Sequence, residues 1–106
     1  MELTQDKYNM PIPTGRSIAT ADATATPIKS PVTIGAGNTI ALKKPNNAAE
    51  LQLKPSNTIQ VSEKSDMSQY YETDESMVLG VSGTENIYLK NPGSSDVVVS
   101  FLFVLL

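Results

Sequence analysis

The residue types that could carry catalysis are few in this chain. Its 106 residues contain neither cysteine nor histidine. Thiolate chemistry, disulfides and any Ser-His-Asp or Cys-His arrangement are therefore impossible. Carboxylates, lysines and tyrosines remain. Acidic side chains are densest between residues 63 and 76, where the sequence has Glu63, Asp66, Glu72, Asp74 and Glu75.

These acids match no catalytic or metal-binding spacing. A paired-carboxylate glycosidase holds its two acids on rigid strands at a fixed separation, whereas residues 63–76 have no apolar period and predict a loop. This segment could also hold a short strand around Tyr70 and Tyr71. The D-x-[DN]-x-[DN]-G spacing of a calcium loop does not occur here. Gly35-Ala36-Gly37 precedes no GK[ST] sequence and no predicted helix, so it indicates a turn. We expect no enzyme activity, no cofactor and no metal.

Charge and hydropathy argue against two classes of partner. The net charge is −3, and Lys43–Lys44 is the densest basic point, so no basic stripe is available for nucleic acid. The longest apolar run is residues 97–106, whereas a helical membrane span needs about 20 residues. The first fifteen residues lack the apolar segment of a secretion signal. We expect no nucleic acid, no membrane and no secretion signal.

The elements that would position these side chains are short strands. Apolar residues recur two apart with mostly polar residues between them, which predicts strands with one face in a core. Further segments bring the expected total to about eight strands. The expected architecture is an all-β, two-sheet antiparallel β-sandwich, Ig-like or jelly-roll. The alternating pairs are Ile40/Leu42, Leu51/Leu53, Ile59/Val61 and Ile87/Leu89, and the other expected strands are 17–25, 32–34, 77–81 and 97–106.

Proline and glycine divide the chain further. Residues 1–16 contain Pro11 and Pro13 and show no period, which predicts an extended N-terminal arm before a single sandwich domain at 17–106. The sequence Gly35-Ala36-Gly37-Asn38 lies between two short strands, 32–34 and 39–43. Because such residues tolerate positive φ, this pattern predicts a hairpin that joins the two strands.

The last ten residues form the most informative predicted strand. Val97, Val99, Phe101, Phe103 and Leu105 alternate with Val98, Ser100, Leu102, Val104 and Leu106, so both faces are apolar. Only one face can point into a two-layer core, and an apolar second face needs a cover. Either the N-terminal arm or a neighbouring subunit could provide it. We favour the subunit and expect a homo-oligomer, because the run continues to the final residue. Its contact residues would be Leu102, Val104 and Leu106.

Tyrosines are the other candidates for contact. Tyr70 and Tyr71 could form a platform for sugar or a hot spot for a protein, since tyrosine suits half-wet contacts. Ordinary packing in the sandwich is the alternative. Neighbouring residues of a strand face opposite ways, so we expect only one of the two to be exposed. In the arm, Tyr8 is the candidate anchor on a partner, together with Met10 and Ile12.

The chain also resembles a known class of protein. A polar arm with prolines precedes a Ser/Thr/Asn-rich sandwich, and the phrase Asn86-Ile87-Tyr88-Leu89-Lys90-Asn91-Pro92-Gly93-Ser94-Ser95 leads into a closing Val-Val-Val strand. Over about residues 30–106 this resembles small virion structural proteins of tailed bacteriophages, particularly capsid decoration (cement) proteins. The resemblance implies a non-catalytic protein that binds the major capsid protein or another virion protein and stabilises the shell. It also implies synthesis in the host cytoplasm and a final location on the capsid surface.

Two other functions fit the same sequence. One is a carbohydrate- or receptor-binding β-sandwich module of a fibre or surface protein, which would need exposed aromatic side chains such as Tyr70 or Tyr71. The other is a head-tail or tail assembly protein.

Overall fold

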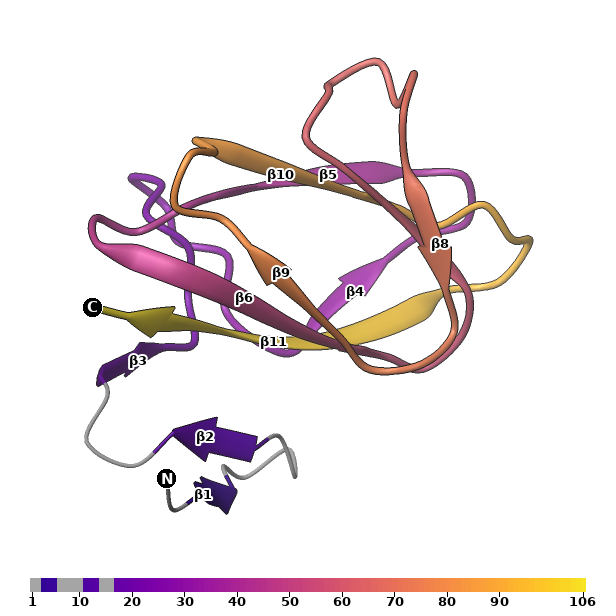
Figure 1. The fold of residues 1–106 in the computed structure, drawn as a ribbon. Helices are drawn as coiled ribbons and strands as arrows, with labels where there is room; N and C mark the ends of the chain where they lie inside the picture. Colours follow the sequence, from indigo (N-terminus) through magenta and orange to yellow (C-terminus); the bar gives the residue numbers. More distant parts are fainter. Residues whose placement is uncertain (1–2, 6–10, 14–16) are drawn as a thin grey trace.

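The structure, a computed structural model, describes residues 3–5, 11–13 and 17–106. Every regular element in this part of the chain is a β-strand (Figure 1). The strands are β1 (Leu3–Gln5), β2 (Pro11–Pro13), β3 (Ser17–Ala19), β4 (Val32–Ile34), β5 (Thr39–Lys43), β6 (Ala48–Pro55), β7 (Ile59–Ser62), β8 (Tyr71–Thr73), β9 (Met77–Gly80), β10 (Asn86–Lys90) and β11 (Val97–Leu105).

Two sheets pack face to face and make the body of the molecule. One is four-stranded, in the order β5-β10-β7-β8; the other is five-stranded, in the order β3-β11-β6-β9, with β4 also paired to β11. All strand pairs are antiparallel. The predicted all-β, two-sheet antiparallel sandwich is confirmed.

The core lies between the sheets and follows the alternation seen in the sequence. Seven of the eight paired residues that predicted it are buried, and Ile40 packs against them while partly buried. Phe101 and Phe103 of β11 meet edge to face, with ring centroids 6.1 Å apart and an interplanar angle of 76°. This is a favoured geometry for aromatic pairs. The largest fully buried side chains are Phe101, Phe103, Ile34, Leu42, Leu51, Leu53, Ile59, Ile87, Leu89, Leu102, Val81 and Val99.

The predicted hairpin between residues 32–34 and 39–43 is wrong. Strand β4 pairs with β11, while β5 pairs with β10 in the other sheet. The segment between them still turns, with Gly37 at φ 73 and Asn38 N donating to Gly35 O at 3.0 Å. It carries the chain across the sandwich instead of back on itself. Asn91, just after β10, fixes this crossing by accepting from Gly37 N at 2.9 Å and donating to Asn38 O at 3.0 Å.

The predicted strand at 17–25 is also too long, because only Ser17–Ala19 pairs with β11. Asp22 is the physical reason. Its Oδ1 accepts from Thr24 N at 3.3 Å and from Ile28 N at 2.9 Å, which holds the backbone in a turn where a strand would extend. An isolated bridge between Ala21 and Lys29 closes this loop.

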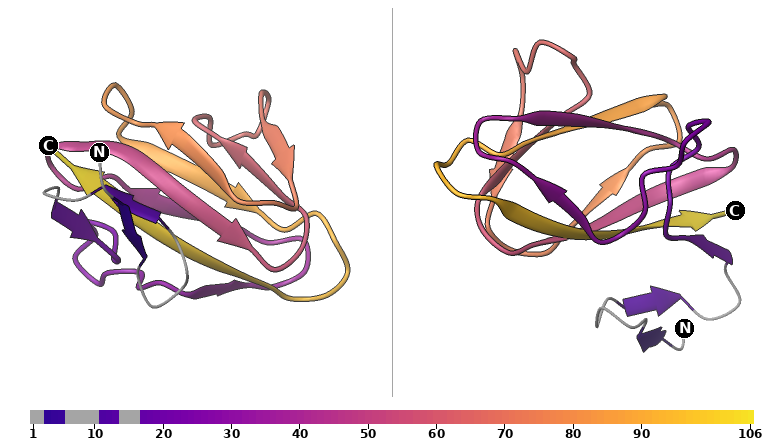
Figure 2. Two further views of the ribbon diagram at one scale, coloured as in Figure 1. Left: turned by 60° about the horizontal axis from the view of Figure 1, so that its bottom comes forward. Right: turned by 180° about the vertical axis from the view of Figure 1, so that it is seen from behind.

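Most of the predicted N-terminal arm lies outside the described residues, Tyr8 and Met10 included. The described parts, β1 and β2, pair antiparallel with each other in a two-stranded sheet. Ile12 lies in β2, where its backbone is opposite Thr4. The views agree in placing β1 and β2 on the side of β11 and β3 that faces away from the core (Figures 1 and 2).

Candidate functional site

The outward face of the five-stranded sheet is the first candidate surface. Antiparallel partners point to the same side of a sheet, so the strand register shows which residues share this face. Val78 of β9 is opposite Gln52 of β6, and Gln52 is opposite Leu102 of β11. Two further rows place Lys54 opposite Ser100 and Ile18 opposite Val104. We call this surface the outer face.

Part of the outer face is covered by the chain itself. Leu102 and Val104 are fully buried, and Ile18 of β3 packs against both. The small β1–β2 sheet lies on this same side of β11 (Figure 2). Two of the three C-terminal residues predicted to contact a partner, Leu102 and Val104, therefore cannot do so unless their cover moves. The third, Leu106, is 80% exposed.

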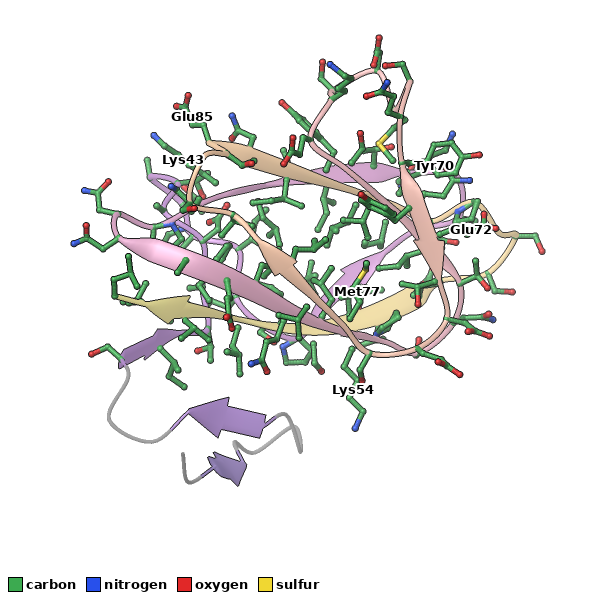
Figure 3. The ribbon with its side chains drawn as sticks, in the orientation of Figure 1. Lys43, Lys54, Tyr70, Glu72, Met77 and Glu85 are labelled. Carbon is green, nitrogen blue, oxygen red and sulfur yellow. The ribbon has the colours of Figure 1, made fainter. Side chains whose placement is uncertain are left out.

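Other parts of the outer face are exposed to solvent. Val78 is 59% exposed and Val98 is 41% exposed. Val98 also borders a shallow hollow of about 280 Å³. Figure 3 shows Lys54 pointing away from the sandwich on this side. The residues that line the hollow are Lys54, Pro55, Ser56, Val98 and Ser100.

Gln52 sits between the covered and the bare regions. Its side chain is 6% exposed, and its Oε1 has no hydrogen-bond partner within the described part of the chain. A buried acceptor without a donor costs free energy. The unpaired acceptor thus lies beneath the outer face, beside Leu102 and Val78, and is closed to solvent.

The second candidate surface is a cleft of about 410 Å³ at the open edge of the sandwich. It opens where β8 ends one sheet and β9 ends the other. Buried apolar side chains line its floor, and a polar loop with two tyrosines forms its rim. We call it the tyrosine cleft. Its lining residues are Val61, Ser62, Glu63, Lys64, Gln69, Tyr70, Tyr71, Leu79, Gly80, Val81, Thr84 and Ile87.

Both tyrosines are exposed, so the prediction that only one would be exposed is wrong. Tyr70 is 51% exposed and Tyr71 is 68% exposed. Tyr70 precedes β8 and so does not follow the alternation of a strand (Figure 3). Tyr71 is opposite Val61 and shares its core-facing side. Because β8 is the edge strand, no further strand of its own sheet covers Tyr71 there, and the residue stands at the mouth of the cleft.

Hydrogen bonds within the loop 63–70 hold its backbone in place. The Ser62 hydroxyl donates to the Gln69 carbonyl and accepts from Lys64 N at 2.9 Å. Asp66 Oδ1 accepts from Ser68 N at 3.0 Å, and Met67 between them has a positive φ of 57. Hydrogen bonds from Ser68 keep the pKa of Asp66 below its ordinary value. The loop is thus ordered by its own polar groups.

The acids that the sequence singled out are separated in space. Glu63 Oε1 accepts from Thr84 Oγ1 at 2.8 Å across the cleft, while Glu72 Oε1 accepts from Gln60 Nε2 at 3.2 Å on β7. Among the described residues, no group of three or more His, Cys, Asp or Glu side chains could hold a metal ion. No helix in the same part of the chain is long and apolar enough to span a membrane.

Several residues of these surfaces were not expected from the sequence. Leu79 and Val81 enter the cleft because β9 leaves the sheet of β8 and joins β6, which is a feature of tertiary structure. Thr84 reaches Glu63 across 21 residues of sequence. Val98, in contrast, belongs to the second apolar face that the sequence singled out.

Comparisons with protein families, with curated proteins and with solved structures found no match to this chain.

Proposed function

We propose that this protein is a non-catalytic virion structural protein of the decoration type. In this proposal it is made in the host cytoplasm and binds the major capsid protein, or another virion protein, on the capsid surface. The observation that carries the proposal is the bare part of the outer face. There Val78 and Val98 remain exposed, Val98 beside a hollow, on a sheet whose residues Leu102 and Val104 are buried.

The outer face suits docking to a large, repetitive surface. Covering what remains exposed of each valine is worth about 1 kcal/mol, so one copy gains little from these two contacts. On a lattice many weak contacts act together, and avidity raises the overall binding. Decoration of a shell needs nothing more than such contacts.

The resemblance in sequence supports the same class of protein. The Ser/Thr/Asn-rich strands and the closing valines resemble those of small phage virion proteins, and residues 17–106 form a β-sandwich. A net charge of −3 would also keep decorated particles from associating with one another.

The proposal is tested on particles purified from the source virus. The protein should be found in them by mass spectrometry, and added protein should rebind to particles from which it has been stripped. Rebound particles should release their DNA at a higher temperature than stripped ones. Absence of the protein from purified particles, or an unchanged release temperature after rebinding, would contradict the proposal.

A further inference from the structure

We propose that the tyrosine cleft binds a neutral saccharide. This site is separate from the outer face, and the inference does not depend on attachment to a capsid. Residues 78 and 79 show the separation, because they are neighbours on one strand. Val78 lies on the outer face, whereas Leu79 lines the cleft from the opposite side of β9.

The two tyrosines provide the aromatic surface that a sugar needs. Their rings have an apolar body and a polar tip, and both are at least half exposed. A pyranose ring presents C–H groups on its faces and hydroxyls around its edge. It can therefore pack a face on a tyrosine ring while its hydroxyls remain hydrogen-bonded. Large exposed rings that keep a hydroxyl in water suit such a half-wet ligand better than a fully apolar one.

The polar side chains of the rim can hydrogen-bond hydroxyls in both directions. Glu63 provides a carboxylate acceptor whose Oε1 is already held by Thr84. Lys64 provides an ammonium donor, and Gln69 provides an amide that can donate and accept. Each hydroxyl of a sugar is both a donor and an acceptor, so this mixed rim fits a polyol.

Charge balance at the rim selects for a neutral ligand. The cleft is lined by one carboxylate, Glu63, and one ammonium, Lys64, which cancel. A charged ligand would meet one attractive and one repulsive charge at this rim, so a net charge on the ligand brings no advantage. The cleft volume of about 410 Å³ lies in the range of small-molecule sites, about 300–1,000 Å³. It accommodates one or two sugar rings.

The test is a titration followed by two-dimensional amide NMR spectra of the whole chain. The probes are neutral disaccharides: maltose, cellobiose, lactose and chitobiose. We expect at least one of them to shift the amide signals of residues 63–71 and 79–84, with a dissociation constant of about 1 mM. Signals of the outer face, such as that of Val98, should not move.

Variants then assign the contact to the tyrosines. Tyr71→Ala and Tyr70→Ala should each weaken binding by about tenfold or more, as expected when an aromatic contact is removed. Tyr88→Ala is the matched control, because Tyr88 of β10 is not among the cleft residues. It should bind as the unchanged protein does. Both cleft tyrosines are exposed, so their variants should fold, and unchanged amide spectra away from the cleft would demonstrate this.

Three results would overturn the proposal. One is that none of the four disaccharides shifts cleft signals. Another is that Tyr70→Ala and Tyr71→Ala both bind as tightly as the unchanged protein. The third is that N-acetyl-leucine amide shifts the cleft signals while the sugars do not, since the site would then accept an apolar peptide side chain.

Discussion

At the scale of single residues, Asn91 links the two sheets through its side-chain hydrogen bonds. It is fully buried, and each polar atom of its side chain is used. Nδ2 donates to Ile34 O at 2.9 Å and to Ser95 O at 2.6 Å, while Oδ1 accepts from Gly93 N at 2.9 Å. One amide thus joins the end of β4 in one sheet to the segment that follows β10 in the other.

We predict that Asn91→Ala lowers the free energy of unfolding by about 2–4 kcal/mol, because it leaves buried backbone groups unpaired. Asn91→Asp should cost at least as much, since it replaces a double donor with a buried carboxylate. Urea unfolding followed by circular dichroism measures both. Asn46→Ala, at an exposed turn position, is the control and should change stability by about 0.5 kcal/mol or less. Equal effects at the two positions would contradict the role given to Asn91.

Asp22 orders the loop between β3 and β4. Desolvation raises the pKa of its carboxyl, but hydrogen bonds outweigh this effect and the pKa lies below its ordinary value. Two of the donors are the Thr24 hydroxyl, at 2.7 Å from Oδ1, and Lys43 N, at 3.1 Å from Oδ2. Because the pKa is lower in the folded chain, the ionised carboxylate stabilises the fold. That stabilisation is complete above the unfolded pKa and is lost as pH falls through the folded one.

We predict that Asp22→Asn destabilises the protein by about 1–3 kcal/mol at pH 7, where one donor loses its acceptor. The difference in free energy of unfolding between the variant and the unchanged protein should become smaller once the pH falls below about 4 and the carboxyl takes up a proton. Unfolding curves of both proteins are measured across this pH range. The difference between the two at each pH removes the contribution of the other acids, which both proteins share. A difference in free energy of unfolding that stays constant down to the lowest pH would contradict a stabilising charge on Asp22.

At the scale of elements, β11 is the strand on which the fold depends. It pairs with β3, β4 and β6, and its Phe101 and Phe103 fill the middle of the core. Its outward side differs along its length, since Leu102 is fully buried and Val98 is 41% exposed.

We predict different costs for truncating these two outward side chains. Leu102→Ala should lower the free energy of unfolding of the free protein by about 2–4 kcal/mol, as is usual for a buried leucine. Val98→Ala should cost less than about 1 kcal/mol. Chemical unfolding of both variants at low protein concentration gives the comparison. A small cost for Leu102→Ala would show that the chain does not cover β11 by itself.

Strands could be predicted from the sequence where apolar and polar residues alternate clearly. The prediction of strand partners failed where the paired residues are far apart in the sequence. The pairs Leu51/Leu53 and Ile87/Leu89 predicted their strands correctly, because a period of two residues depends only on local sequence. The partner of β4 could not be read in this way. Its three residues pair with Val97–Val99, more than sixty positions away, and nothing in the turn Gly35–Asn38 distinguishes a hairpin from a crossing between sheets.

For the candidate sites too, local features could be predicted from the sequence and features of tertiary structure could not. Tyr70 and Tyr71 could be identified as candidates from their residue type, and β11 from its apolar second face, because both features are local in the sequence. The cleft beneath the tyrosines depends on β8 and β9 belonging to different sheets, although only three residues separate them. Exposure of both tyrosines follows from that arrangement and not from their own sequence.

At the scale of the whole molecule, a homo-oligomer stays a prediction. The exposed apolar residues Val78 and Val98 of the outer face, and Leu106 after the end of β11, are what a second copy would have to cover. Light scattering after gel filtration, at about 100 µM protein, measures the mass of the free assembly. We predict a mass of at least twice the 11.4 kDa of one chain. A single-chain mass at this concentration would contradict self-association in solution.

The central claim is that the protein works by attachment through the outer face. The most direct test is rebinding of variants to stripped particles, measured as the amount of protein that sediments with them. We predict that the double variant Val78→Glu/Val98→Glu loses most of its binding, by about tenfold or more, because charge would be buried against the shell. The control is Thr39→Glu/Ala41→Glu, which adds the same charge at exposed positions on β5, and it should bind normally. Equal binding of both double variants and the unchanged protein would contradict the account.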